Sequence, residues 1–325
     1  MKKQKHRLIA LMLALLVGAS PIASLGASAT EAEAKDGSQS QVMAEEAPYK
    51  REAAGALTRN RPGAIYRSLH TVGNKSIYSY NRYGISVGGR DVSGSALLIN
   101  GEYYVPLRAL ANALGAGYSY DSATRVATFR ASGLTLTAAS GSYTVYANDR
   151  PLFAMTPSVI MNDSRLYITL SSFAKASGLA YSVSGQRIRI TGSLRPIKHA
   201  SAYYRSDEVF WLARIIEAES RGEPLLGKIA VGNVVLNRVR SSSYPNTIYG
   251  VIFDRKYGVQ FSPVLDGSIY NTPSYNSTLA AKICLEGFDT SDGALFFLRP
   301  ETSESSWIPK NRVYVFSIGK HDFYK

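Results

Sequence analysis

The spacing of apolar positions changes along the chain and divides it into regions. An apolar run from Leu8 to Val17 is followed by residues 30 to about 80, which have few periodic apolar positions. From the segment ISVGGRDV onward, short runs rich in Tyr, Val and Ile alternate with turns such as Asn100-Gly101, as in strands and hairpins. After TGSLRPIKHASAYY, near Ser201, apolar residues recur at helical spacing. The pattern predicts a β-rich region followed by a mostly helical one, an α+β chain.

The β-rich region contains an internal repeat at a shift of 63 residues. The segment YVPLRALANALGAGYSY, residues 104–120, matches YITLSSFAKASGLAYSV, residues 167–183. Each copy is expected to form a strand, a short amphipathic helix ended by a glycine, and then a strand pair. Two such units could bury one shared core. The recurring positions are Tyr104, Leu107, Ala111, Gly115, Tyr118 and Ser119, which return as Tyr167, Leu170, Ala174, Gly178, Tyr181 and Ser182.

A helix is predicted to begin at Ser206, whose hydroxyl could cap free amides, with acidic residues in the following turn. An apolar stripe at spacings of three and four then runs from Val209 to Ile216. The next segment, PLLGKIAVGNVVLNRVRS, is apolar nearly all round and is predicted to be the central helix of its domain.

Three glutamates crowd the segment RIIEAESRGEP, residues 214–224, and their spacing separates them. Glu219 continues the apolar stripe, where lost solvation would raise its pKa and suit it to act as a general acid. Glu217 is expected on the solvated side, three residues after Arg214. Glu223 lies between a glycine and a proline and is expected at a corner. The alternative for Glu219 is a structural carboxylate in a salt bridge with Arg221 or Arg238.

The N-terminus has the pattern of a secretory signal peptide, residues 1–29. A basic stretch, an apolar run and the small residues Ala27-Ser28-Ala29 follow one another, and the apolar run is short for a membrane span of about 20 residues. Residues 30–80 have the composition of a flexible linker. We therefore expect a secreted protein that is at most peripheral to the membrane.

The chain is basic. Its formal charge of +13, less the four positive residues of the expected signal, leaves +9 for the mature chain. The positive residues are scattered, which disfavours nucleic acid and favours anionic cell-wall polymers as partners of an exported monomer. The single cysteine, Cys284, lies in an apolar helical run and is expected to be a buried, inert thiol. Four histidines without metal-ligand spacing predict no metal and no cofactor.

Residues 84–192, marked by NGEYYVPLRALANALGAGYSYD, resemble the copper amine oxidase N-terminal-like stalk domain of secreted Gram-positive proteins. The resemblance implies a spacer or wall-contact module, to which we assign residues 81–195. Copper itself is not expected, because this stretch contains no histidine or cysteine.

From about Asp207 to the C-terminus, ordered blocks resemble the SleB-type cell-wall hydrolase family, the spore cortex-lytic enzymes. The blocks are LARIIEAESRGEPLLGKIAVGNVVLNRV, YPNTIYGVIF, QFSPVLDG, ALFFLRP, SSWI and IGKHDFY. The resemblance implies a lysozyme-like α+β domain, residues 201–325, that cleaves peptidoglycan glycan strands. It therefore also implies that the secreted protein is associated with the cell wall or spore cortex. It also implies that Glu219, the first glutamate of the family's EARGE block, is catalytic.

Other residues of these blocks are weaker candidates for glycan binding. An amide could bond sugar hydroxyls and an aromatic ring could cover a sugar face, although core packing explains phenylalanines equally well. The candidates are Gln260, Phe261, Tyr270, Phe297 and Trp307, and for Trp307 and His321 a cleft wall and a core position both stay open.

Glu219 has no convincing second carboxylate beside it in the sequence, since Asp254, Asp266 and Glu286 lack an apolar setting. Inverting and retaining glycosidases use two carboxylates. We therefore expect a lytic transglycosylase rather than a hydrolase, acting between N-acetylmuramic acid and N-acetylglucosamine. The alternatives are a glycosidase, a zinc amidase, which the histidines disfavour, and a non-catalytic wall-binding protein.

Overall fold

The computed structural model describes residues 80–256, 258–303 and 307–325. The predicted signal peptide, and all of the predicted linker except residue 80, lie outside the described residues. Within the described part of the chain, no helix has the length and apolar character needed to cross a membrane.

The β-rich region, residues 81–191, consists of two sheets and two short helices. The seven-stranded sheet has the order β11-β12-β1-β2-β3-β10-β9 and the five-stranded sheet the order β4-β5-β6-β7-β8, and every pairing except that of β1 with β12 is antiparallel. The elements are β1 Asn81–Val87, β2 Arg90–Ile99, β3 Glu102–Pro106, α2 Leu107–Ala113, β4 Gly117–Asp121, β5 Val126–Ala131, β6 Leu134–Ala139, β7 Thr144–Ala147, β8 Arg150–Phe153, β9 Val159–Asn162, β10 Arg165–Thr169, α3 Leu170–Ser177, β11 Ala180–Ser184 and β12 Arg187–Thr191.

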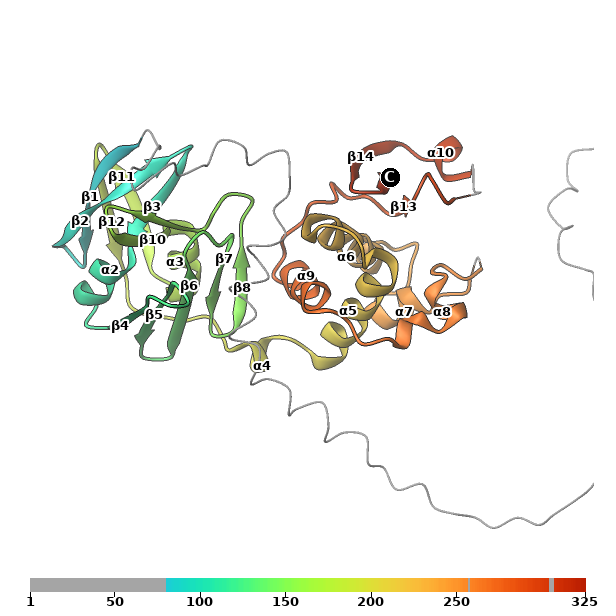
Figure 1. The fold of residues 1–325 in the computed structure, drawn as a ribbon, viewed down its shortest axis with the longest axis horizontal. Coiled ribbons are helices and arrows are strands. Elements are labelled where there is room, and N and C mark those ends of the chain that lie inside the picture. Colours follow the sequence, from blue (N-terminus) through green and yellow to red (C-terminus); the bar gives the residue numbers. More distant parts are fainter. Residues whose placement is uncertain (1–79, 257, 304–306) are drawn as a thin grey trace, which may run out of the picture. The chain divides into compact units, whose positions relative to one another are not determined.

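The predicted repeat is confirmed as two copies of strand, helix and strand pair. The first is β3-α2-β4-β5 and the second is β10-α3-β11-β12. The two copies meet where β3 and β10 pair antiparallel, with Val105 opposite Ile168. Both helices contact strands of both sheets (Figure 1), and Leu107, Leu110 and Phe173 are fully buried in one core. Both copies therefore contribute to one shared core.

The turn after α3 requires the glycine that the sequence placed there. Gly178 has a φ of +71°, and a Cβ at this position would lie 2.4 Å from the carbonyl oxygen of Arg195. The left-handed backbone and the close approach both exclude a side chain.

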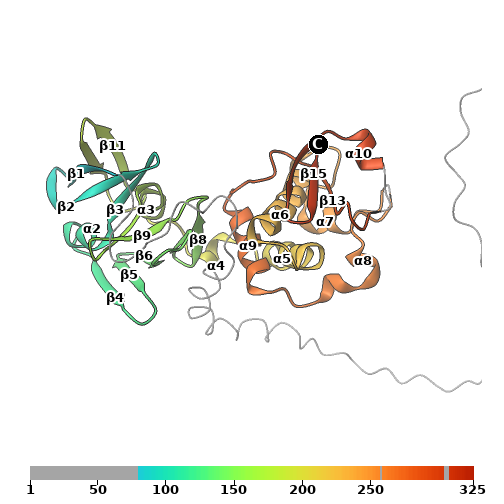
Figure 2. The same cartoon turned by 45° about the horizontal axis from the view of Figure 1, so that its top comes forward.

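The C-terminal region, residues 200–325, is helical with a small three-stranded sheet of order β13-β15-β14. In both views α5, α6 and α9 pack together, and the small sheet lies on the other side of α6 (Figures 1 and 2). The elements are α4 Ala200–Tyr203, α5 Ser206–Ser220, α6 Leu225–Arg240, α7 Ile248–Ile252, α8 Pro263–Asp266, the 3-10 helix η1 Ser268–Tyr270, α9 Tyr275–Leu285, β13 Phe296–Leu298, α10 Trp307–Asn311, β14 Tyr314–Ile318 and β15 His321–Tyr324.

The helix α6 is central, as its all-round apolar pattern predicts. One side, with Ile229, packs against α5 and α9, and the opposite side, with Val231, packs against the small sheet. At the crossing a Cβ on Gly232 would lie 2.8 Å from both Cys284 Sγ and Ile216 Cδ1. Cys284 itself is buried, and its thiol donates to the carbonyl oxygen of Ile229 over 3.3 Å, so the prediction of a buried thiol is confirmed.

The helix α5 begins at Ser206, but its hydroxyl does not cap it. Arg205 occupies the cap position, no side chain accepts from the free amides there, and Ser206 is the first helical residue. The expected capping role was wrong. The acidic first turn of Asp207 and Glu208 is in place and favours the helix through its dipole.

Candidate functional site

Glu219 lies in the last turn of α5, where the apolar stripe of that helix ends. Leu212, Ile215 and Ile216 of the stripe are fully buried against the core, and Glu219, one turn further on, is partly buried. The helix therefore carries a carboxyl group from the core to the edge of a cavity, as the spacing predicts.

The cavity beside Glu219 has a volume of about 510 Å³, a size typical of ligand sites. It is formed by the ends of α5 and α6, the segment before α8, β13 and α10. Four of the five predicted glycan-binding residues line it: Gln260, Phe261, Phe297 and Trp307.

The fifth candidate, Tyr270, does not line this cavity. It lies on η1 with 62% of its surface exposed, and its ring centroid is 6.3 Å from that of Trp211. His321 is 6% exposed on β15 among buried residues, so it belongs to the core, whereas Trp307 is 52% exposed at the cavity. The structure thus places His321 in the core and Trp307 at the cavity, a choice that the sequence alone left open.

Burial raises the pKa of the Glu219 carboxyl to about 7, with Asp266 adding to the effect and the Arg238 cation opposing it. A carboxyl with this pKa holds its proton on about half of the molecules at neutral pH. Asp266 is itself exposed and accepts a hydrogen bond from the backbone of Ser268. Among the residues described around the cavity, Glu219 is the single carboxylate.

Arg238 is a cavity residue that the sequence considered only as a structural partner for Glu219. It is 5% exposed, its Nε donates to the carbonyl oxygen of Leu295 over 2.8 Å, and its Nη1 has no hydrogen-bond partner. Its guanidinium carbon lies 5.1 Å from the ring centroid of Phe261. The signal available in the sequence was its spacing, because Arg238 follows Val234 by four residues and Val231 by seven on an apolar helix.

A salt bridge that neutralises Glu219 is not found in the described part of the chain. Arg221, one expected partner, instead approaches Glu217, with 3.3 Å between Arg221 Nε and Glu217 Oε1. Arg238 acts on Glu219 through its charge without an ion pair within 4 Å. The carboxyl of Glu219 therefore remains available to a molecule in the cavity.

Glu217 is buried, and its expected position on a solvated helix face was wrong. It is 7% exposed, and its Oε2 accepts hydrogen bonds from the Ser274 hydroxyl at 2.6 Å and the Ser277 hydroxyl at 2.7 Å. Burial alone would raise the pKa of Glu217, but these hydrogen bonds outweigh it and hold the pKa below its ordinary value. Glu217 therefore joins α5 to the start of α9 and stays ionised.

Glu223 occupies a buried corner, as the flanking glycine and proline predict. Its Oε2 accepts a hydrogen bond from the backbone nitrogen of Lys320 over 3.0 Å, and its Oε1 lies 3.7 Å from His321 Nδ1. Gly319 has a φ of +59°, and a Cβ there would be 1.7 Å from Glu223 Oε2. Glu223 thus holds the turn between β14 and β15 in place.

Glu286, which was expected to lack an apolar setting, has a side chain that is 4% exposed, and it accepts a hydrogen bond from the Tyr204 hydroxyl over 2.5 Å. It does not line the cavity of Glu219. The absence of a second catalytic carboxylate stays a prediction.

The described residues contain no cluster of three or more His, Cys, Asp or Glu side chains that could hold a metal ion. The β-rich region has neither histidine nor cysteine between residues 84 and 192, so its residues do not fit the copper site that a resemblance to copper proteins implies.

Comparison with known proteins finds a match for each of the two regions. Residues 222–324 match the family model described as Cell Wall Hydrolase, and residues 86–191 match the Copper amine oxidase N-terminal domain. Both resemblances predicted from the sequence are confirmed, as is the α+β class of the chain.

The relatives of the C-terminal region are spore cortex-lytic enzymes. The chain is 42% identical over 122 residues to the enzyme of Bacillus cereus, covering 38% of this chain and 46% of the relative. It is 37% identical over 120 residues to that of Bacillus subtilis, covering 37% and 38%. The chain thus spans less than half the length of these two curated relatives.

Among solved structures, the chain is similar to the catalytic domain of the germination-specific lytic transglycosylase SleB from Bacillus anthracis. The identity is 42%, the match covers 38% of this chain and 97% of that one, and the TM-score is 0.35. The catalytic domain of the Bacillus cereus SleB protein matches with 42% identity, 38% and 92% coverage and a TM-score of 0.35.

Proposed function

We propose that this chain is a peptidoglycan-lytic enzyme and that it cleaves the bond between N-acetylmuramic acid and N-acetylglucosamine as a lytic transglycosylase. The observation that carries the proposal is Glu219, a carboxyl with a pKa raised to about 7 at the edge of a 510 Å³ cavity with aromatic walls. The similarity of the C-terminal region to spore cortex-lytic enzymes supports the same substrate class.

Glu219 would act first as an acid. Its proton passes to the glycosidic oxygen as the bond from that oxygen to the muramyl C1 breaks, which leaves positive charge on the sugar ring. The Arg238 cation, which lowers the pKa of Glu219, stabilises the carboxylate that remains. Burial and Arg238 together leave a carboxyl that holds a proton at neutral pH and can still release it.

The second step uses the same carboxylate as a base. It takes the proton of the muramyl 6-hydroxyl while that oxygen bonds to C1, so a 1,6-anhydro ring closes and Glu219 is again protonated. No water is consumed. A hydrolase would need a second carboxylate about 5 to 9.5 Å from the first, and the other described residues lining the cavity include none.

The match to the hydrolase family model begins at residue 222, so it does not include Glu219. The assignment of Glu219 therefore needs the geometry of the cavity in addition to the similarity. Gln260 and Trp307 are proposed to bind the sugar next to the cleaved bond, through amide hydrogen bonds and ring stacking. Tyr270 is proposed to contact a more distant sugar of the same strand.

We further propose the organisation of the whole chain. Residues 1–29 would be a signal peptide, 30–80 a linker, 81–195 a stalk domain and 201–325 the catalytic domain. The protein would act outside the membrane, on the cell wall or spore cortex, without a cofactor.

The test is mass spectrometry of digested sacculi with the full chain and its Glu219→Gln variant. The wild type should release muramyl products with an anhydro ring, and Glu219→Gln should release none. The matched control is Glu208→Gln, which changes a 39% exposed carboxyl on the same helix and should keep full activity. Products carrying an added water would show a hydrolase, and lysis by Glu219→Gln would overturn the role of this residue. Binding without lysis by the wild type would indicate a non-catalytic wall protein.

A further inference from the structure

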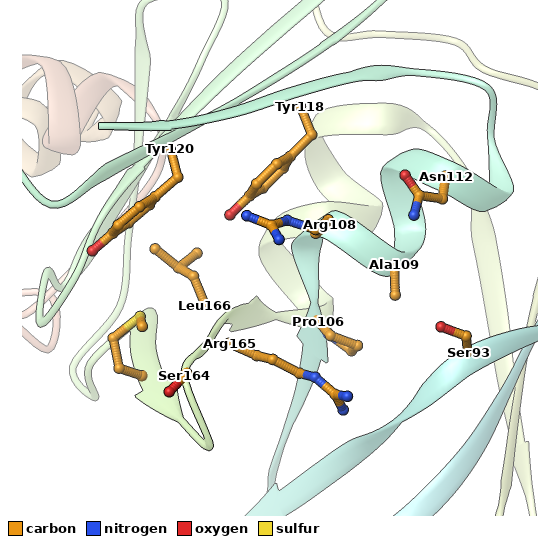
Figure 3. A pocket seen from close by; sticks show the side chains of 11 residues that line it. Ser93, Pro106, Arg108, Ala109, Asn112, Tyr118, Tyr120, Ser164, Arg165 and Leu166 are labelled. Atoms are coloured by element: carbon orange, nitrogen blue, oxygen red, sulfur yellow. The ribbon is translucent and has the colours of Figure 1, made fainter. Parts of the chain in front are cut away.

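A second cavity, of about 300 Å³, opens in the β-rich region (Figure 3). Its walls come from β2, α2, β4 and the hairpin of β9 and β10, and it shares no residue with the cavity of Glu219. No carboxylate is found among its described lining residues. The lining side chains that matter here are Ser93, Arg108, Asn112, Tyr118, Tyr120 and Arg165.

The two arginines of this cavity are exposed, and neither has an acidic partner among the described residues. The Arg108 guanidinium carbon lies 4.8 Å from the ring centroid of Tyr118, and Figure 3 shows the two side chains together. Arg165 runs beside Gly94, where an added Cβ would lie 3.7 Å from Arg165 Nη1. In the described part of the chain neither arginine has a carboxylate within 4 Å. The cavity is therefore positively charged.

The internal repeat contains a second pair of residues at the positions equivalent to Arg108 and Arg165. At the shift of 63 residues, Arg108 corresponds to Ser171 and Arg165 corresponds to Glu102. Ser171 and Glu102 contact each other directly, because the serine hydroxyl donates to Glu102 Oε1 over 2.9 Å. At one end of the paired repeats, Ser171 and Glu102 are therefore hydrogen-bonded to each other. At the other end, the equivalent positions hold the two arginines.

Two cations at neighbouring positions repel each other, so their mutual interaction does not stabilise the fold. An anion bound between them would reverse the sign of their interaction and offset this cost. The core positions repeat faithfully, as with Leu107 and Leu170, whereas the arginines do not. The arginines are therefore better explained by a ligand than by folding.

The aromatic lining adds a second recognition element. Tyr118 and Tyr120 are alternate residues of β4, so their half-buried rings share one face of the strand and border the cavity (Figure 3). Tyrosine offers a flat apolar face together with a hydroxyl, which suits a sugar ring and its hydroxyl groups. Asn112 supplies an amide that can both donate and accept hydrogen bonds.

We propose that this cavity binds an anionic carbohydrate of the cell wall. Arg108 and Arg165 hold its carboxylate or phosphate, and Tyr118 and Tyr120 cover its sugar ring. The β-rich region is then an anchor that binds the wall while the C-terminal region cleaves it. The proposal rests on the proposed function only for the wall as its location, and binding does not require cleavage.

The experiment measures co-sedimentation of the full chain with purified sacculi, in a Glu219→Gln background that prevents digestion. Two preparations distinguish the anion: sacculi that retain their phosphodiester polymers, and sacculi stripped of them, in which carboxylates remain. The test variant is Arg108→Gln/Arg165→Gln. The matched control is Arg130→Gln/Arg189→Gln, which removes two exposed arginines of the same region outside the cavity.

The test variant should bind about tenfold more weakly or worse, the loss expected for a charge-assisted hydrogen-bond pair, while the control binds nearly as tightly as the parent. A loss on both preparations identifies a carboxylate sugar of peptidoglycan, and a loss confined to the unstripped one identifies a phosphodiester polymer. Equal binding by the test and control variants on both preparations overturns the proposal.

A second variant guards against loss of folding. Arg108→Ser/Arg165→Glu copies the pair that Ser171 and Glu102 already form in this chain, so it should melt at or above the parent temperature. It should still lose binding. If it binds as tightly as the parent, the cavity does not recognise an anion.

Discussion

The Ser277 hydroxyl donates a hydrogen bond to the Glu217 carboxylate over 2.7 Å, between residues 60 positions apart in the chain. The same carboxylate oxygen accepts from the backbone nitrogen and the hydroxyl of Ser274. Glu217 therefore ties α5, which carries Glu219, to the first turn of α9. Glu217 thus has a structural role, whereas Glu219, two residues later, faces the cavity.

Replacing Glu217 by Gln should lower stability and spare catalysis. The amide loses the charge that strengthens three hydrogen bonds, so we expect the free energy of unfolding to fall by about 1 to 3 kcal/mol. Lysis of sacculi below the melting temperature should stay close to wild type, because Glu217 does not line the cavity. Urea unfolding measures the first effect, with Glu208→Gln as control. Unchanged stability would show that these hydrogen bonds contribute nothing.

The rate of lysis should fall as the pH rises through about 7. The first step needs Glu219 protonated, and burial raises the pKa of this carboxyl to about 7. Above that pH the acid form declines about tenfold per pH unit. Initial rates of turbidity loss, measured from pH 5 to 9 at constant ionic strength, give the profile. A rate that stayed constant up to pH 9 would exclude Glu219 as the acid.

Removing the charge of Arg238 should shift that profile. The Arg238 cation lowers the pKa of Glu219, so Arg238→Gln should move the alkaline limb to higher pH and also slow the reaction, because the carboxylate left after proton donation is less stable. Arg240→Gln, which changes an exposed arginine two residues later, is the control. A limb that does not move would mean that Arg238 acts only through packing.

The sequence was sufficient for features that depend on periodicity. The repeat at 63 residues, the central position of α6 and the placement of Glu219 at the end of a buried stripe all follow from spacings within one element. Such spacings decide which face of a helix or strand is buried, and the structure agrees.

Features that depend on distant contacts were beyond the sequence. Glu217 is buried because two serines at the start of α9 satisfy its charge, and nothing near residue 217 indicates them. Arg108 and Arg165 come from different repeats and line one cavity because β3 and β10 pair. Local spacing predicts faces, whereas tertiary pairing decides which polar groups find partners.

Trp307 and Tyr270 should differ in the length of glycan fragment for which their replacement weakens binding. Trp307 lines the cavity of Glu219, so Trp307→Ala should raise the half-saturating concentration of short and long glycan fragments alike, by about three- to tenfold. Tyr270 lies outside that lining, so Tyr270→Ala should matter only for long fragments. Kinetics on size-fractionated glycans test both, with Tyr181→Ala, an exposed aromatic of the β-rich region, as control. An equal effect of Tyr270→Ala on the shortest fragments would contradict its placement.

The Glu219→Gln variant should be more stable than wild type at high pH, because burial disfavours the charged form of this carboxyl. The pKa of Glu219 is about 7 in the folded protein and the ordinary value is 4.5, so the folded state holds this proton more tightly than the unfolded chain does. Stability from the protonated form is complete below about pH 4.5 and is lost as the pH rises to about 7. Glutamine does not titrate, so the variant avoids that loss.

The difference in the free energy of unfolding between Glu219→Gln and wild type should therefore grow by about 1 to 3 kcal/mol from pH 4 to pH 8. Urea unfolding at both pH values measures it. Glu208→Gln, on the accessible first turn of the same helix, should show no such growth. A constant difference for Glu219→Gln would mean that the folded protein does not disfavour the charged carboxylate, and the acid role of Glu219 would lose its physical basis.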